Sequence, residues 1–246
     1  ENRLCKPAMS ECLADTSNLP TTHHLILYRK WLASEAGLMI TGNVAVDRDH
    51  LERVGNVLID GEPSPSRMKA LESWAKVGVL TGKHFWMQLN HAGRQTPFFL
   101  NAKPLSASNV HLKNVPGQRF GKPKSMDQQQ IYAVIEKFAF AAGIAERAGF
   151  TGVQIHAAHG DLISQFLSPV VNLRSDIWGG PLENRARLLI HCIRAIKENV
   201  GKKFPVSVKI NLSDFQSAEF WPDDFEKLRL ILNSEPIDLL EISGET

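Results

Sequence analysis

A short polar stretch follows one of the apolar runs of the chain: His156, His159 and Asp161 come directly after Gly152–Ile155. At the end of a strand, two neutral imidazoles can donate hydrogen bonds to a single substrate oxygen. Two other interpretations stay open, a zinc site and histidines that only satisfy loop carbonyls. Zincin ligands follow the pattern His-Glu-x-x-His on a helix, whereas this His-Ala-Ala-His segment follows a strand and has no glutamate. We therefore predict no metal site.

Polar side chains also end the other apolar runs. Lys209 is costly to bury in such a run unless it faces an anion or a carbonyl group. Gln88 can both donate and accept hydrogen bonds, which suits a ring that carries both kinds of group. Gly42 would leave room for a flat ligand to approach the backbone. The whole set of strand-end residues is Ala8, Met9, Ser10, Thr41, Gly42, Asn43, Gln88, Asn90, His91, Arg94, His156, His159, Asp161, Lys209, Asn211, Ser243 and Gly244.

The elements that must position these residues are short apolar runs separated by longer amphipathic ones. The apolar runs show little alternation, as expected for parallel strands that are covered on both faces. We predict strands at residues 37–42, 84–89, 152–156, 205–210 and 237–242, with the remains of another at 3–6. We predict helices at residues 22–36, 66–81, 127–148, 182–200 and 223–233. Ser125 and Gln128 have the spacing of a capping box at the start of the third helix.

This alternation of strands and helices indicates an α/β fold with a parallel sheet. A closed barrel needs eight strands and eight helices, and the sequence supplies about six strands and five helices. A doubly wound open sheet would also fit six strands. However, no Gly-x-Gly-x-x-Gly follows the first strand, which argues against a dinucleotide-binding sheet of that type.

The composition excludes several classes of function. Lys and Arg total 28 and Asp and Glu total 26, so charge gives no reason to expect binding to nucleic acid or to an acidic membrane. No run of about 18 apolar residues predicts a transmembrane span, and the first residues lack the apolar region of a signal peptide. Cys5, Cys12 and Cys192 form no disulfide framework. We expect all three to be buried in a cytoplasmic protein.

Several segments resemble, in order and spacing, the Old Yellow Enzyme, or NADH:flavin oxidoreductase, family. The most specific is Gly149–Gly160, and Gln88–Arg94 and Glu183–Arg187 add to it. The resemblance covers essentially the whole chain. It implies a TIM-type (β/α)8 barrel, here incomplete with about six βα units, as a single FMN-binding domain over residues 1–246.

The resemblance also implies roles for residues at the mouth of the barrel. Ser10 should lie near the redox-active edge of FMN, and Gly42 by the O4 side. Gln88 should bind the pyrimidine ring. Lys209 should lie near N1 and the C2 carbonyl, where its charge would stabilise the anionic reduced flavin. The full set of expected cofactor-binding residues is Ala8, Met9, Ser10, Gly42, Gln88 and Lys209.

On the substrate side, His156 and His159 match the family's pair that hydrogen-bonds a carbonyl or nitro oxygen. The expected electron donor is NADH or NADPH, and the expected acceptor is an enone, a quinone or a similar small molecule. A homo-oligomer is a further expectation. Residues 103–124 resemble a lid, a type of loop that usually sets substrate choice. Polar residues further along are expected to brace the fourth loop: Asn172, Arg174, Asp176, Glu183, Asn184 and Arg187.

Asp161 departs from the family pattern, in which a tyrosine at this position gives a proton to the substrate α-carbon. A phenol keeps its proton at neutral pH, whereas an ordinary aspartate with a pKa near 3.9 has lost it. Two nearby histidines are expected to hold this carboxylate ionised. Flavin reduction should then survive, while alkene reduction should be slowed or use water as the acid. Alternatively, Asp161 only caps the start of a helix.

A second departure is the extent of the chain, which would lack the phosphate-binding loops after strands seven and eight. We expect weak FMN binding and an unpaired sheet edge in consequence. The predicted function is that of an FMN-dependent NAD(P)H oxidoreductase. One alternative is a catalytically impaired fragment or pseudoenzyme of that family. Another is a metal-dependent barrel hydrolase that uses His156, His159 and Asp161.

Overall fold

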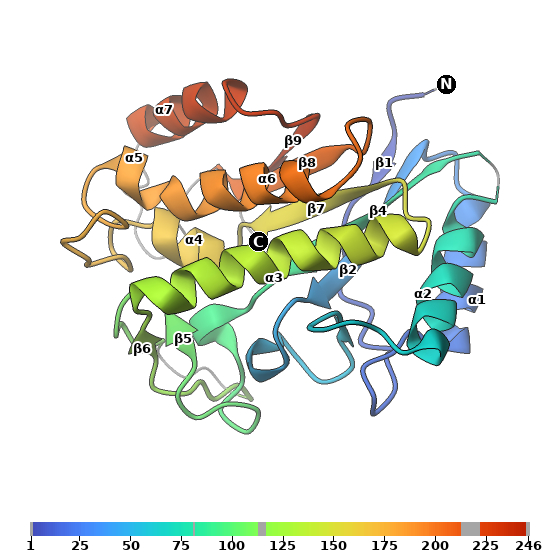
Figure 1. Cartoon of the computed structure of the whole chain (residues 1–246), viewed down its shortest axis with the longest axis horizontal. Coiled ribbons are helices and arrows are strands. Elements are labelled where there is room, and N and C mark those ends of the chain that lie inside the picture. Colours follow the sequence, from blue (N-terminus) through green and yellow to red (C-terminus); the bar gives the residue numbers. More distant parts are fainter. Residues whose placement is uncertain (1, 81, 113–116, 213–221, 245–246) are drawn as a thin grey trace.

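The computed structural model describes residues 2–80, 82–112, 117–212 and 222–244 (Figure 1). Within these ranges, the main sheet follows the strand order β1-β2-β4-β7-β8-β9, and every neighbouring pair is parallel. These strands are β1 (Cys5–Lys6), β2 (Leu38–Ala45), β4 (His84–Asn90), β7 (Gly152–Ala157), β8 (Val206–Asn211) and β9 (Leu239–Ser243). A doubly wound sheet reverses its strand order at a switch point. Here the order never reverses, so the fold is the predicted α/β barrel type, incomplete at six strands.

Helices connect successive strands and lie along one side of the curled sheet (Figure 1). The long ones are α1 (Thr22–Leu32), α2 (Pro65–Gly78), α3 (Gln128–Arg147), α6 (Arg187–Asn199) and α7 (Pro222–Asn233). Shorter elements are η1 (Arg48–His50), β3 (Val57–Leu58), η2 (Gly93–Gln95), β5 (Leu105–Ser106), β6 (Lys124–Ser125), α4 (Leu162–Leu167) and α5 (Leu182–Arg185). Helix α1 packs on α2 and α3 packs on α6.

The apolar core lies between these helices and the outer face of the sheet. Tyr28 from α1 and Trp74 from α2 pack around Phe85 of β4, all fully buried. A Cβ added at Gly78 would lie 1.9 Å from the Phe85 ring, so this helix can approach the strand only with glycine there. Because apolar packing takes the outer face, the inner face of the sheet is left to polar side chains.

The predicted helices are all present, and their ends differ from the predictions. Helix α3 begins with a capping box formed by Asp127 and Gln130, not by Ser125 and Gln128. The predicted helix at 182–200 is divided at Ala186 into α5 and α6. Helix α1 ends at Leu32, before the predicted end at residue 36. Thr81, the predicted end of the second helix, lies outside the described residues.

Strand β2 extends beyond its predicted end at Gly42. The register of β2 against β4 shifts between Ile40 and Asn43, which marks a β-bulge. At the bulge, the buried Thr41 hydroxyl accepts a hydrogen bond from the backbone N–H of Gln88 at 3.0 Å. A Thr-Gly-Asn sequence therefore continues the strand here, although its composition indicates a turn.

The structure bears on two further expectations, which concern membrane-spanning helices and the burial of the cysteines. No helix among the described residues is long and apolar enough to cross a membrane. The expectation of three buried cysteines is wrong, because only Cys192 is buried whereas Cys5 and Cys12 are exposed. Cys5 lies in the short first strand, and Cys12 lies in a loop with a φ of 55°.

Candidate active site

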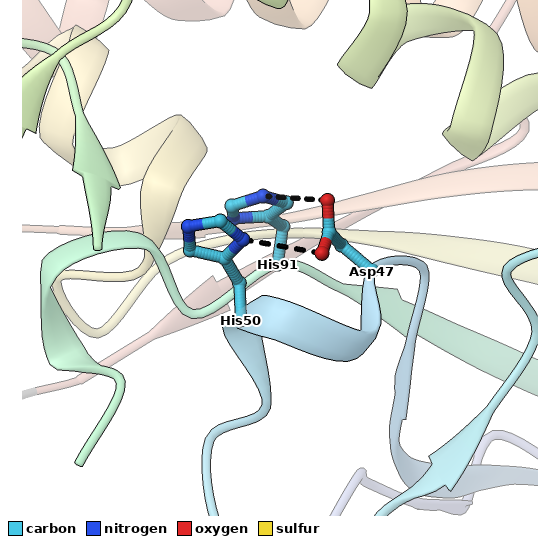
Figure 2. Close-up of side chains that lie close together, drawn as sticks. All are labelled: Asp47, His50 and His91. Carbon is cyan, nitrogen blue, oxygen red and sulfur yellow. Dashed lines mark ion pairs between the residues drawn. The ribbon is translucent and has the colours of Figure 1, made fainter. Parts of the chain in front are cut away.

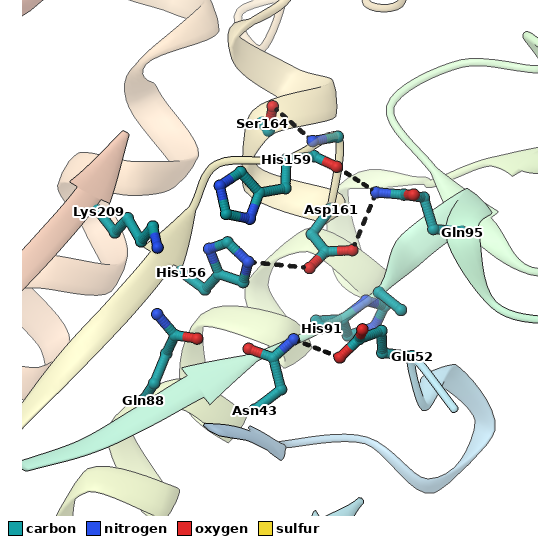
Figure 3. A network of polar contacts seen from close by, with 12 residues as sticks. Asn43, Glu52, Gln88, His91, Gln95, His156, His159, Asp161, Ser164 and Lys209 are labelled. Atoms are coloured by element: carbon teal, nitrogen blue, oxygen red, sulfur yellow. Dashed lines mark hydrogen bonds and ion pairs between the residues drawn. The ribbon is translucent and has the colours of Figure 1, made fainter. Parts of the chain in front are cut away.

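His156 is buried on the inner face of β7, near the end of the strand. Its Nε2 lies 3.3 Å from Oδ2 of Asp161 (Figure 3). Its Nδ1 is buried without a hydrogen-bond partner among the described residues. The ring of His159 lies edge-on to that of His156, with 5.0 Å between centroids. The predicted catalytic residues therefore come together, with one imidazole nitrogen left for a ligand.

His159 is held in place by the two strands that follow. Its φ of 59° lies in the left-handed region, which few non-glycine residues adopt without support. Its backbone N–H donates to Oδ1 of Asn211 at 3.1 Å, and its Nε2 lies 2.8 Å from the Ser243 hydroxyl. The ends of β7, β8 and β9 therefore fix this imidazole together.

Asp161 does not carry the charge state that the sequence led us to expect. Burial, followed by the negative charge of Glu52, raises its pKa well above the ordinary value. Hydrogen bonds from Asn90 and Gln95 lower it by less. The expectation that histidines would hold the carboxylate ionised is wrong, because both imidazoles are themselves kept neutral.

Both imidazoles at the site have lowered pKa values. For His156 burial is the main cause, and the nearby His159 and Lys209 add to it. For His159 burial again comes first, followed by the charge of Lys209. Asp161 does lie at the N-cap of α4, as the alternative prediction had it, but its side chain makes no capping hydrogen bond.

Gln88 and Lys209 also lie on the inner face of the sheet, both nearly buried. The Gln88 Nε2 donates to Gln154, whereas its Oε1 has no partner among the hydrogen bonds of the described residues. The Lys209 ammonium pairs with Glu241 at 3.0 Å. An amide oxygen and a cation on one face fit the imide N–H and carbonyl oxygens of a flavin pyrimidine ring. These residues therefore fit FMN.

The segment after β1 lies over β2. A Cβ added at Gly42 would lie 2.4 Å from the Met9 carbonyl oxygen and 2.2 Å from the Glu11 carboxylate. Glycine is therefore needed for this chain segment to pack, which differs from our expectation of room for a flat ligand. The Ser10 hydroxyl donates a hydrogen bond to Oε2 of Glu52 at 2.7 Å. The Asn43 side-chain amide donates to the same oxygen at 2.6 Å. Ala8 is half-buried and Met9 is exposed.

Glu52 is a site residue that sequence reasoning missed. It receives hydrogen bonds from the first two strand ends, through Ser10 and Asn43, and it raises the pKa of Asp161. Its position in the loop after η1 gives no periodic signal. Only the fold brings it to the mouth of the barrel.

A pocket of about 840 Å³ adjoins this cluster. Its lining residues are Glu52, Arg53, Gln95, Pro97, Phe98, Phe99, Gly117, Gln118, Arg119 and Phe120. Gln95 connects the pocket to the cluster, because its Nε2 donates to Oδ1 of Asp161 at 3.2 Å. Part of the pocket wall comes from the predicted lid, of which residues 113–116 lie outside the described residues.

The expected brace after β7 is present except for Glu183, which is exposed and makes no hydrogen bond among those of the described residues. Nη1 of Arg174 donates to the Ala107 and Met126 carbonyls and to the Ser125 hydroxyl. The Asn172 amide donates to the carbonyls of Phe166 and Trp178. Asp176, Asn184 and Arg187 add local hydrogen bonds. Sequence reasoning missed Arg185, whose buried guanidinium bonds Asp224 of α7.

A second cluster of two histidines and an aspartate lies after β2 and β4 (Figure 2). Asp47 lies 3.2 Å from Nδ1 of His50 and 3.8 Å from Nε2 of His91, and it also pairs with Lys137. Among the described residues, these three are the group whose ligand atoms lie close enough for a metal. The two rings are stacked at 4.3 Å with 24° between planes, so their nitrogens point side by side instead of converging. Asp47 accepts hydrogen bonds from the Asp49 N–H at 2.8 Å and from Lys137, so the contacts favour an ion-paired carboxylate over a metal centre.

Comparisons with known proteins agree with this architecture. The sequence profile of the NADH:flavin oxidoreductase / NADH oxidase family matches residues 1–231. An NADH-dependent flavin oxidoreductase of Hypocrea jecorina is 38% identical over 100% of this chain, and one of Aspergillus parasiticus is 37% identical over 99%. The solved Old Yellow Enzyme homologue of Zymomonas mobilis superposes with a TM-score of 0.89 at 25% identity over 99% of the chain.

The chain is shorter than these relatives. It covers 64% of the Hypocrea protein, 57% of the Aspergillus protein and 69% of the Zymomonas structure. The comparisons therefore concern the first six strands of the barrel and the residues at their ends.

Proposed function

This chain belongs to the NADH:flavin oxidoreductase / NADH oxidase family, and we propose that it acts as an FMN-dependent NAD(P)H oxidoreductase on activated alkenes, quinones or similar acceptors. The observation that carries the proposal is the pairing of His156 with Asp161 beside an unpartnered imidazole nitrogen. Metal-dependent hydrolysis is not favoured, because His156, His159 and Asp161 are not among the groups close enough for a metal.

Two residues of the inner face would hold the cofactor. The Gln88 amide oxygen would accept from the pyrimidine N–H, and the Lys209 ammonium would lie against the carbonyl side of that ring. When bound, FMN supplies a carrier that takes hydride from NAD(P)H and gives it to the acceptor. Ser10 and Gly42 stay proposed neighbours of the ring, together with Ala8 and Met9.

The two histidines would bind the acceptor. Their lowered pKa values favour neutral rings, and a neutral imidazole carries one N–H that can donate to a carbonyl or nitro oxygen. Such hydrogen bonds draw electron density toward the oxygen and make the β-carbon a better hydride acceptor. The neighbouring pocket, with Phe98 and Phe99 on its wall, would take the rest of the molecule.

Asp161 would supply the proton that alkene reduction requires. Its raised pKa keeps a proton on a buried carboxyl group that faces His156, so the group can act as an acid without a phenol. After transfer of the proton to the substrate α-carbon, the carboxylate would regain one from solvent through the pocket beside Gln95. Reduction of a quinone oxygen would depend less on this residue.

The first test is a visible absorption spectrum of the purified chain after incubation with FMN and passage through a desalting column. We expect a retained flavin spectrum that bleaches with NADH or NADPH. A colourless eluate would overturn the proposal and favour an impaired fragment or pseudoenzyme.

The second test separates the two half-reactions in an Asp161→Asn variant. An amide cannot give up a proton, so enone turnover should fall about 100-fold while NAD(P)H still bleaches the flavin. An unchanged rate of enone reduction would remove Asp161 from the mechanism. A cytoplasmic location and a homo-oligomer are further parts of the proposal, which fractionation and size-exclusion chromatography would test.

A further inference from the structure

Four side chains on the inner face of the sheet form one continuous chain of contacts. Gln88 of β4 donates through Nε2 to Oε1 of Gln154 on β7, at 2.6 Å. Gln154 donates through its own Nε2 to Oε2 of Glu241 on β9, at 2.8 Å. The other oxygen of Glu241 lies 3.0 Å from the Lys209 ammonium. The registers place Gln88 opposite Gln154 and Lys209 opposite Glu241, so the contacts follow from the strand pairing.

The Glu241 carboxylate decides the direction of both amide hydrogen bonds in this chain of contacts. A carboxylate only accepts hydrogen bonds, whereas a glutamine amide can present either its oxygen or its nitrogen. Gln154 must therefore turn its nitrogen to Glu241, which leaves its oxygen for Gln88. Gln88 must then donate, which leaves its own oxygen for a ligand. Without Glu241, the two amides could rotate together and present a donor instead.

The same carboxylate offsets a charge. The Lys209 side chain is 8% exposed and that of Glu241 is 21% exposed, so solvent screens their interaction only in part. A lone cation beside the pyrimidine ring would favour an anionic reduced flavin over the neutral oxidised one. Glu241 therefore weakens this preference.

We propose that Glu241 is a positioning residue of the FMN site, which orients the Gln88 amide through Gln154 and offsets the charge of Lys209. The inference rests on the proposed function, because it takes FMN as the ligand of this face. Glu241 itself contacts no reacting atom.

Two variants separate the two effects. Gln154→Met interrupts the hydrogen-bond chain and keeps the ion pair, so oxidised FMN should bind about 5-fold more weakly with an unchanged midpoint potential. Glu241→Gln removes the negative charge and, because an amide can present either its oxygen or its nitrogen, no longer fixes the direction of the hydrogen bonds. It should weaken the binding of oxidised FMN by a similar factor. It should also raise the affinity for reduced FMN relative to oxidised FMN about 10-fold, which corresponds to a rise of about 30 mV in midpoint potential.

Fluorescence quenching gives the affinity, and dye-linked reduction gives the potential. The control is Glu226→Gln, which removes the same charge from an exposed pair with Arg229 on α7 and should change neither quantity. A merely structural Glu241 would weaken binding of both flavin forms equally. An unchanged affinity ratio in Glu241→Gln, or a shifted potential in Gln154→Met, would therefore overturn the proposal.

A measurement without flavin tests the electrostatic part. Burial and Lys209 lower the pKa of His159, whereas Glu241 and Glu52 raise it. Glu241→Gln should therefore lower the His159 pKa further, as seen by NMR titration of its imidazole, and Glu226→Gln should not. If the unchanged chain holds no FMN, this inference and the proposed function both fail. If FMN is retained while the His159 titration stays unchanged, only this inference fails.

Discussion

Two clusters in this molecule are built from the same residue types, two histidines and one aspartate, and both lie buried where strands of the sheet end (Figures 2 and 3). Around Asp47, burial alone would raise the carboxyl pKa, but the His50 hydrogen bond, His91 and Lys137 outweigh it and hold the pKa well below its ordinary value. Around Asp161, burial and the charge of Glu52 raise the pKa.

The difference lies in the charges that surround each carboxyl group. Lys137 brings a cation to Asp47. For Asp161, the largest effect on the pKa after burial is the negative charge of Glu52. One cluster therefore holds a carboxyl group whose pKa is lowered, and the other holds a carboxyl group whose pKa is raised. Residue types alone therefore do not separate the Asp47 cluster from the cluster that we propose to be catalytic.

The largest expected effect is on folding, from Asp47→Asn. This change removes the buried anion beside His50, His91 and Lys137, and breaking a buried charged network costs about 3 kcal/mol of unfolding free energy. Urea denaturation followed by circular dichroism measures the loss. The control is Asp49→Asn, since that neighbouring side chain is exposed. A loss as small as that of the control would mean that the Asp47 cluster does not hold the loops.

A smaller effect should appear in the pH dependence of stability, with opposite signs for the two aspartates. Asp47 has a lowered folded-state pKa, so its contribution is present above the ordinary pKa and is lost as pH falls. Asp161 has a raised folded-state pKa, so stability is present below the ordinary value and is lost as pH rises through the raised one.

Unfolding free energies measured from about pH 2 to about pH 8 test this difference, because the Asp47 contribution is lost below the ordinary aspartate pKa near 3.9. Asp161→Asn mimics the neutral acid and should flatten the decline in stability on the alkaline side, by about 1.4 kcal/mol for each unit of pKa shift. Asp47→Asn should flatten only the acid side. If Asp161→Asn leaves the alkaline slope as it was, Asp161 is ionised in the folded protein.

The smallest effect should come from Lys137→Gln. The lysine side chain is 39% exposed, so its pair with Asp47 is partly screened and should contribute less than about 1 kcal/mol. Without this cation the Asp47 pKa should rise, and the acid loss of stability should begin at a higher pH. If stability is lost at the same acid pH as in the unchanged protein, Lys137 does not contribute to the lowered pKa of Asp47.

Much of the fold follows from local sequence patterns. Apolar runs gave the main strands because parallel strands covered on both faces need continuous apolar sequence. The short helix α4 and the continuation of β2 beyond Gly42 were missed, since a six-residue helix has little periodicity and the Thr41 bulge resembles a turn. The choice between a barrel and an open sheet depended on strand order, which no local pattern contains.

The sequence predicted which residues form the candidate site, but it did not predict their pKa shifts. His156, His159 and Asp161 lie close together in sequence, so their proximity was expected. The raised pKa of Asp161 depends on burial and on Glu52, which comes from a loop more than a hundred positions earlier in the sequence. Glu241 lacked any motif, because its role arises from strand register.

The Arg174 brace has a consequence for how this protein can change over evolutionary time. Its guanidinium holds Ala107 and Ser125 together, and β5 pairs with β6 at the same place. The chain between these points is thus a loop with clamped ends, in which a doubling of length costs only about 0.6 kcal/mol of closure entropy. Insertions there would alter the shape of the pocket while the described part of the barrel keeps its own shape, so the pocket can change at little cost to folding.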